Sequence, residues 1–145
     1  MDITLSLALP RDRLSVPVVR RILSDALTTL GLDAGTVGDI ELALTEACTN
    51  VLDHAGGKEE YEVSACIDKE QCVIEIIDRG IGFGGEGPAR SLMAEDGRGI
   101  AIMRTLMDRL EFRESEVSGT VVHLEKRLTW DESAVLSRLE RRESD

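Results

Sequence analysis

A glycine-rich segment between Gly80 and Gly99 limits what this chain of 145 residues can fold into more than any other feature. Seven of the 13 glycines in the sequence fall within it, together with Pro88. Glycine loses more backbone freedom on folding than any other residue, and proline cannot donate a hydrogen bond to a sheet ladder. The segment is therefore unsuited to a helix or a central strand, and we interpret it as a long functional loop or a linker.

Hydrophobic periodicity before this segment predicts a strand followed by two helices. The first ten residues alternate apolar and polar side chains, as in a half-buried strand, and end at Pro10. Ser15 can cap a first helix that stops at Gly31, and Thr36 opens a second helix that runs to about His54. The second helix has a narrow apolar stripe, formed by Ile40, Leu44, Ala47 and Val51.

Two pairs of strands complete the pattern, one on each side of the glycine-rich segment. Residues 60–68 and 72–78 predict two strands that pair as a hairpin. After the glycine-rich segment comes a helix, and residues 110–114 and 120–128 then predict a second hairpin that turns near Ser118 and Gly119. The apolar residues at helical spacing in that helix are Ile100, Met103, Met107 and Leu110.

This order of elements predicts an α+β fold with two layers. Neighbouring strands that pair directly form a mixed, mostly antiparallel sheet, and the helices cover one of its faces. We expect one domain over residues 1–130 and a charged tail over residues 131–145 that could form a short helix. A βαβ nucleotide-binding fold fits this order poorly.

The composition excludes several classes of function. Acidic residues outnumber basic ones by 28 to 17, a formal net charge of −11, and aromatic residues make up only 3% of the chain. A nucleic-acid-binding surface needs a basic stripe and aromatic rings, so we expect none. We also expect no membrane helix and no secretion signal, which makes the cytoplasm the default location. Three cysteines without a paired spacing are interpreted as buried thiols: Cys48, Cys66 and Cys72.

The second predicted helix contains the first candidate functional pair, Glu46 and Asn50. Residues four apart lie on the same side of a helix, so this carboxylate and this amide lie together beside the apolar stripe. Mg²⁺ binds hard oxygen ligands and takes few of them from protein, so the Asn50 amide is a plausible ligand. Glu46 could polarise a hydroxyl or a water. The alternative is a solvated helix face with an ordinary hydrogen bond.

The second candidate is Asp78, which closes a predicted buried strand just before Gly80 and Gly82. Glycines allow the backbone to approach a ligand closely, and the carboxylate could accept a hydrogen bond from an amino group such as that of adenine. A turn after a strand has the same composition, so a structural interpretation stays open.

The third candidate is the start of the helix that follows the glycine-rich segment, at Gly97, Arg98 and Gly99. Backbone N–H groups at a helix N-terminus bind phosphate oxygens, and Arg98 could add positive charge. Such a glycine pair is also common in ordinary loops. The sequence contains neither a P-loop motif nor a dinucleotide-binding glycine motif.

In order and spacing, the three candidates together resemble the ATP-binding domain of the GHKL superfamily, which includes gyrase, Hsp90-type chaperones, histidine kinases and mismatch-repair ATPases. The segments TEACTNVLDHA, IIDRGIGF and GRGIAIMRTLMDRLEF are most similar to those of the bacterial anti-sigma-factor serine-protein kinases. The resemblance spans the chain from the first strand to about Leu128.

The resemblance implies a role for each candidate residue. Asn50 would bind Mg²⁺, and Glu46 would be the general base toward the attacking hydroxyl. Asp78 would bind the adenine amine in a pocket shaped by Gly80 and Gly82, and Thr120 would place a hydroxyl near the adenine. The segment 84–96 would be the ATP lid. The residues along the phosphates would be Gly97, Arg98 and Gly99.

The resemblance also implies a function and partners. Such kinases use ATP to phosphorylate a serine on an anti-anti-sigma partner, hold a sigma factor inactive, and generally form homodimers. This chain departs from some relatives, because Glu95 and Asp96 stand where those relatives have a basic lid residue, so Arg90 or Arg98 would supply the charge near the γ-phosphate. It also has Ala101 where many histidine kinases have a third glycine.

Two other functions fit the same sequence. One is a non-catalytic ATP-binding module that sequesters a transcription regulator and uses the nucleotide only as a conformational ligand. The other is a slow ATPase within a larger assembly.

Overall fold

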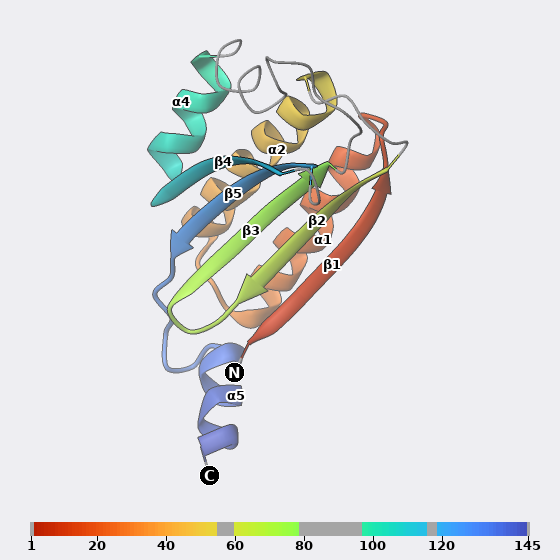
Figure 1. Ribbon diagram of the computed structural model, residues 1–145. Coiled ribbons are helices and arrows are strands. Elements are labelled where there is room, and N and C mark those ends of the chain that lie inside the picture. The colour runs from red at the N-terminus through yellow and green to blue at the C-terminus, as the bar shows by residue number, and fades with distance from the viewer. Residues whose placement is uncertain (1, 55–59, 79–96, 116–118, 145) are drawn as a thin grey trace.

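Five strands form one antiparallel sheet in the order β1-β2-β3-β5-β4. The structure is a computed structural model that describes residues 2–54, 60–78, 97–115 and 119–144. The elements, shown in Figure 1, are β1 (Ile3–Pro10), α1 (Ser15–Leu30), α2 (Ala34–His54), β2 (Glu60–Ile67), β3 (Gln71–Asp78), α4 (Gly97–Leu106), β4 (Arg109–Ser115), β5 (Gly119–Arg127) and α5 (Val135–Ser144).

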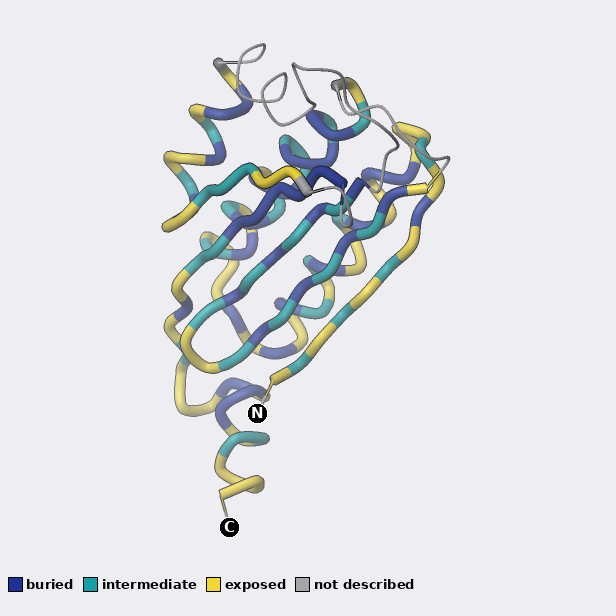
Figure 2. Tube along the Cα trace, viewed as in Figure 1, coloured by how far each residue is buried: buried dark blue, intermediate teal, exposed yellow. Residues whose placement is uncertain are grey.

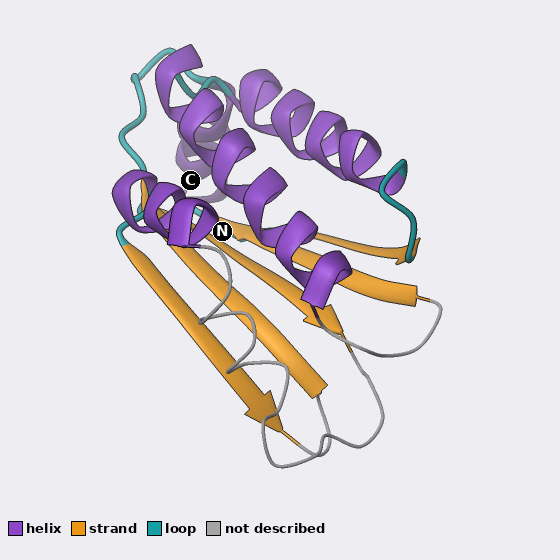
Figure 3. Ribbon diagram, turned by 90° about the horizontal axis from the view of Figure 1, so that it is seen from above, coloured by secondary structure: helices purple, strands orange, loops and turns teal. Residues whose placement is uncertain are grey.

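The helices α1, α2 and α4 cover one face of the sheet, as the view from above in Figure 3 shows. This arrangement confirms the predicted α+β fold with two layers. The two predicted hairpins, β2 with β3 and β4 with β5, are also present. The chain places β5 rather than β4 beside β3, so the second hairpin joins the sheet through its later strand.

The core lies between the sheet and the helices and follows the predicted patterns. Residues of β2 and β3 alternate between buried and half-buried positions along each strand (Figure 2). The apolar stripe predicted on α2 is fully buried, which confirms that α2 packs through this side: Ile40, Leu44, Ala47 and Val51. The predicted buried thiols are confirmed for Cys48 and Cys72, whereas Cys66 is only half-buried.

The starts of the first two helices differ from the prediction. Leu14 rather than Ser15 is the N-cap of α1, and the Ser15 hydroxyl donates to the Asp12 carbonyl at 2.6 Å. Helix α2 begins at Ala34, before Thr36, because the Asp33 carboxylate accepts from the Thr36 N–H at 3.0 Å and from its hydroxyl at 2.8 Å. Carboxylates cap helices as well as hydroxyls do, so an acidic residue ahead of the expected start took this role.

Helix α4 is shorter than the apolar spacing predicts. It ends at Leu106, and Leu110 lies in β4 opposite Leu124 of β5. The Asp108 N–H donates to the Glu125 carbonyl at 2.9 Å, so pairing with β5 begins right after the helix. Sheet pairing therefore overrides the helical spacing at this point.

The chain after β5 packs back against the end of α1. Gly31 follows α1 with a φ of 101°, and a Cβ added there would lie 2.6 Å from the Ala134 Cβ. Leu136 of α5 is fully buried, while α5 itself extends from the end of the molecule opposite the start of α4 (Figure 1). Among the described residues, no helix combines the length and the apolar character needed to cross a membrane.

Candidate functional site

The segments that carry the predicted site residues meet at one end of the molecule. The C-terminal ends of α2 and β3 lie there, together with the N-terminal ends of α4 and β5 (Figure 1). Helix α2 packs against both α1 and α4 and also contacts β3 and β5. The fold thus brings elements that are far apart in the sequence to one region: the ends of α2 and β3 and the starts of α4 and β5.

Asp78 and Thr120 face each other across the central pair of strands. They are register partners where β3 pairs with β5, and each is 0% exposed. Within the described part of the chain, Asp78 Oδ1 and Thr120 Oγ1 are buried without a hydrogen-bond partner. Unpaired buried polar atoms are costly, so such atoms point to a ligand or an ordered solvent molecule that completes them.

Arg11, a residue that the sequence analysis did not select, binds the same carboxylate. Its Nη1 donates to Asp78 Oδ2 at 2.5 Å, and its Nη2 lies 3.3 Å from the Leu52 carbonyl oxygen and 3.5 Å from that of Val51. Burial raises the pKa of Asp78 above its ordinary value, and the guanidinium of Arg11 acts in the opposite direction. The site therefore contains an ion pair between the fully buried Asp78 and the partly buried Arg11.

No signal in the sequence points to Arg11 as a site residue. It follows β1 at the edge of the sheet, and 67 positions separate it from Asp78. Only the strand order, with β2 alone between β1 and β3, brings the two residues within reach.

Asn50 and Glu46 lie on α2 as the spacing predicts. Asn50 is 2% exposed, and its Nδ2 is another buried atom that has no hydrogen-bond partner among the described residues. Glu46 is half-buried. The structure describes no cluster of three or more His, Cys, Asp or Glu side chains that could hold a metal. A metal ion bound by Asn50 would therefore take most of its ligands from groups other than a cluster of such side chains.

The predicted phosphate-binding residues occupy the first turn of α4. The helix begins at Gly97, Arg98 is exposed, and Gly99 is buried. Backbone N–H groups at a helix N-terminus, together with the helix dipole, are suited to bind an anion. Gly80, Gly82 and the predicted lid over residues 84–96, with Arg90, Glu95 and Asp96, lie outside the described residues.

This region has the chemical features of a site for a purine nucleotide. A carboxylate and a hydroxyl lie side by side at the ends of two strands, and an amide and a helix N-terminus lie on the neighbouring helices. The first pair offers hydrogen bonds to a base, and the second pair offers groups that suit phosphates and a hard cation. The roles of the individual residues stay predictions.

Comparison with known proteins identifies the family. The model of the histidine kinase-like ATPase domain matches residues 9–126. The chain belongs to this family, which confirms the resemblance to GHKL proteins.

Proteins with similar sequences include serine-protein kinases and anti-sigma factors. The serine-protein kinase RsbW of Halalkalibacterium halodurans is 32% identical, with 89% of this chain and 86% of the relative covered. The RsbW of Bacillus subtilis is 28% identical, with 78% of each chain covered. The anti-sigma F factor of Clostridium beijerinckii is 32% identical, with 63% of this chain and 71% of the relative covered.

Solved structures support the fold assignment. The structure of the RsbU and RsbW domains of Rv1364c from Mycobacterium tuberculosis superposes with a TM-score of 0.67 at 20% identity, over 89% of this chain and 34% of that one. The histidine kinase domain of Erythrobacter litoralis EL346 gives a TM-score of 0.51 at 18% identity, over 94% of this chain and 66% of that one. At these identities the likeness concerns the fold.

Proposed function

We propose that this protein is an ATP-dependent serine-protein kinase that also acts as an anti-sigma factor. It would phosphorylate a serine of an anti-anti-sigma partner and hold a sigma factor inactive when that partner is absent. The observation that carries the proposal is a set of buried polar atoms that lack a hydrogen-bond partner among the described residues, at the end of the molecule where α4 begins: Asp78 Oδ1, Thr120 Oγ1 and the amide nitrogen of Asn50. The names of the relatives supply the acceptor residue and the regulatory role.

In this proposal, Asp78 and Thr120 bind the base. The open Oδ1 of Asp78 would accept a hydrogen bond from the adenine amine, and the Thr120 hydroxyl would complete a polar contact nearby. The N–H groups of Gly97, Arg98 and Gly99 would bind phosphate oxygens. The glycines at positions 80 and 82 would shape the base pocket.

Asn50 and Glu46 would serve the chemical step. Asn50 would contribute an amide oxygen to a Mg²⁺ ion, which when bound neutralises charge on the phosphates. Glu46 would accept the proton of the substrate serine as its oxygen bonds to the γ-phosphorus and the bond to ADP breaks. Because Glu46 is half-buried, a substrate hydroxyl could reach it from solvent.

The net charge of −11 affects the binding of both ATP and a protein partner. The overall field of the protein repels a triphosphate, so ATP binding would depend on Mg²⁺, helix-terminal N–H groups and nearby arginines. The same acidic surface would attract a partner with basic patches, and salt would weaken that contact. Because a sigma factor acts in transcription, this function would place the protein in the cytoplasm.

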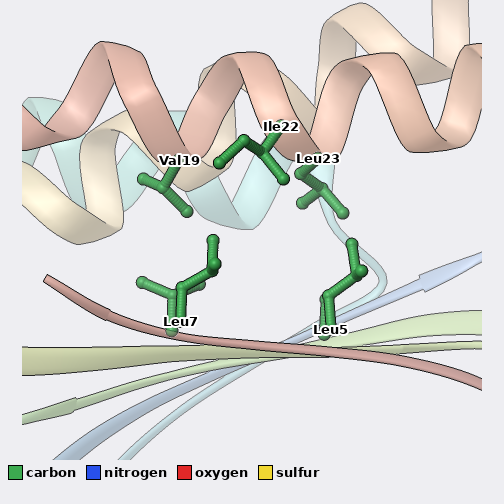
Figure 4. A pocket seen from close by; sticks show the side chains of 7 residues that line it. Leu5, Leu7, Val19, Ile22 and Leu23 are labelled. Atoms are coloured by element: carbon green, nitrogen blue, oxygen red, sulfur yellow. The ribbon is translucent and has the colours of Figure 1, made fainter.

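We also propose a homodimer that forms through the β1 edge of the sheet. Within the described residues, β1 pairs with β2 alone. Its Leu5 and Leu7 are half-buried and point toward Val19, Ile22 and Leu23 of α1 (Figure 4). Such an apolar edge strand is suited to pair with a second copy. Sedimentation of the wild type and of Ile22→Glu tests this: a monomeric wild type would contradict the proposal, and a dimer that Ile22→Glu disrupts would support it.

The kinase activity can be tested with γ-labelled ATP. The protein is purified from its native host with its bound partners, and labelled phosphoserine is sought on those partners. We expect the wild type and Glu41→Gln to label a partner and Glu46→Gln to label none. Glu41 is a matched control, since it lies on the same helix and interacts with Arg20 and Ser24 of α1.

Each other result points to one of the alternatives. ATP binding without transfer to any partner would indicate the non-catalytic module. Phosphate release that needs no protein acceptor would indicate the ATPase.

A further inference from the structure

Arg11 joins two of the elements that carry proposed site residues, α2 with Asn50 and β3 with Asp78. Its side chain is 16% exposed and extends from the segment after β1 to the end of β3, where it pairs with Asp78 at 2.5 Å. The same guanidinium lies near the carbonyl oxygens of Val51 and Leu52, which directly follow Asn50 in α2. These carbonyls belong to the C-terminal turns of a helix, where they attract positive charge.

The two oxygens of the Asp78 carboxylate have different surroundings. Oδ2 accepts from Arg11, whereas Oδ1 is buried and has no hydrogen-bond partner among the described residues. A guanidinium that holds one oxygen fixes the direction of the other. This second oxygen is thus an oriented acceptor to which a ligand can donate a hydrogen bond.

The ion pair between Arg11 and Asp78 also influences whether the Asp78 carboxyl group is ionised and accepts a hydrogen bond. A fully buried carboxylate is costly as an anion, and burial by itself favours the protonated acid. A protonated Asp78 would present a hydroxyl donor to a ligand. Arg11 supplies the opposite charge, which favours the ionised carboxylate and with it the capacity to accept a hydrogen bond.

Adenine and hypoxanthine differ in the group that would meet this oxygen. Adenine has an amino donor at its 6-position, whereas hypoxanthine, like guanine, has a carbonyl acceptor there. An ionised carboxylate accepts a hydrogen bond from the amino group of adenine and repels the carbonyl oxygen of hypoxanthine. A protonated carboxyl group can donate a hydrogen bond to that carbonyl oxygen.

We propose that Arg11 is a positioning residue that makes the site selective for an adenine base, because its ion pair with Asp78 leaves one oriented acceptor oxygen open. This inference rests on the proposed nucleotide site. It adds a residue, outside all three sequence motifs, that sets which base is bound.

The test compares ADP with inosine diphosphate, both with Mg²⁺, by calorimetry. The wild type should bind ADP more tightly. For Arg11→Gln we expect ADP affinity to fall by roughly tenfold or more, as for loss of a charged hydrogen bond, and inosine diphosphate affinity to change much less. The affinity ratio between the two nucleotides should therefore collapse.

Two further variants separate positioning from folding. Arg13→Gln is the matched control, because Arg13 lies two positions further on, is 73% exposed and joins the same segment to α2 through Asp53. It should keep the wild-type ratio. Arg11→Lys retains the charge but not the forked geometry, so it should bind with an intermediate ratio. Thermal unfolding checks that each variant is folded.

The possible results distinguish this inference from the proposed function. A wild type that binds neither nucleotide contradicts the nucleotide site itself. A wild type that prefers ADP, with folded Arg11 variants that keep its ratio or lose both nucleotides equally, overturns the role of Arg11 alone. If Arg11→Gln does not fold, an unchanged ratio in Arg11→Lys overturns the inference by itself.

Discussion

Asp78 and Thr120 are opposite each other at the end of the β3 and β5 pair, and both are fully buried with an oxygen that lacks a partner among the described residues. Unsatisfied polar atoms of this kind weaken a folded protein unless a ligand completes them. These two side chains should therefore contribute more to ligand binding than to the stability of the protein without a ligand.

Replacing Asp78 with Asn should reduce ATP affinity by about tenfold to a hundredfold, since an uncharged amide is a weaker acceptor than a carboxylate. Calorimetry measures the affinity, and circular dichroism shows that the variant is folded. Glu75→Gln is the control, because Glu75 lies on the same strand and interacts instead with His123 and Arg113. Equal affinities of Asp78→Asn and the wild type would remove Asp78 from the site.

Replacing Thr120 with Val should leave the free energy of unfolding unchanged or raise it, while ATP affinity falls several-fold. The hydroxyl has no partner among the described residues, so its loss removes no hydrogen bond in that part of the chain. Ser137→Ala gives the contrast, because the Ser137 hydroxyl donates to the Asp131 carbonyl at 2.8 Å and its loss should cost about 1 kcal/mol. Denaturant titration compares the two, and a Thr120→Val variant as destabilised as Ser137→Ala would contradict this expectation.

Removing Mg²⁺ with a chelator should lower ATP affinity by about tenfold or more, because the protein carries a net charge of −11 and opposes the triphosphate. Asn50→Ala should bind ATP weakly with or without the ion. Calorimetry in the presence and absence of excess chelator measures both. Equal binding by the wild type under the two conditions would count against the assigned site.

Gly31→Ala should destabilise the protein by at least about 1–2 kcal/mol. Its φ of 101° is strained for a residue with a side chain, and the new Cβ would lie 2.6 Å from the Ala134 Cβ. Gly38→Ala in α2 should instead stabilise by about 0.5–1 kcal/mol, because alanine favours helix. A Cβ at Gly38 would meet nothing within 4 Å. The midpoint of thermal or denaturant unfolding should therefore fall for Gly31→Ala and rise for Gly38→Ala.

A thiol reagent should modify Cys66 in the native protein and leave the other two cysteines intact. Burial raises the pKa of Cys48 and of Cys72 to about 12, so neither forms the reactive thiolate near neutral pH. In denaturant all three thiols should react. Mass spectrometry identifies the modified residue, and rapid native labelling of Cys48 would show that the core opens more readily than its packing indicates.

Much of the fold was predictable because its signals are local. The alternation in β2 and β3 and the stripe on α2 depend on spacings of two, three and four residues, and all of these patterns lie where they were expected. Apart from Cys66, which is half-buried, the errors lie at element ends. Asp33 caps α2 in place of Thr36, and pairing with β5 draws Leu110 out of the helical pattern.

The site was only partly predictable, for the same reason. Glu46 and Asn50 are neighbours on one helix, which their spacing alone indicates. The position of Asp78 at a strand end was also visible in the sequence. Arg11 has no such local signal, because its contacts with Val51 and Asp78 join residues 40 and 67 positions apart.

The sequence by itself determined the elements, the apolar faces and the order of the motifs, since neighbouring residues along the chain establish these. The tertiary structure alone decided the strand order β1-β2-β3-β5-β4, which places Thr120 against Asp78 and brings Arg11 to the same carboxylate. Strand order depends on how whole faces bury against each other, and that free energy is not contained in any short segment.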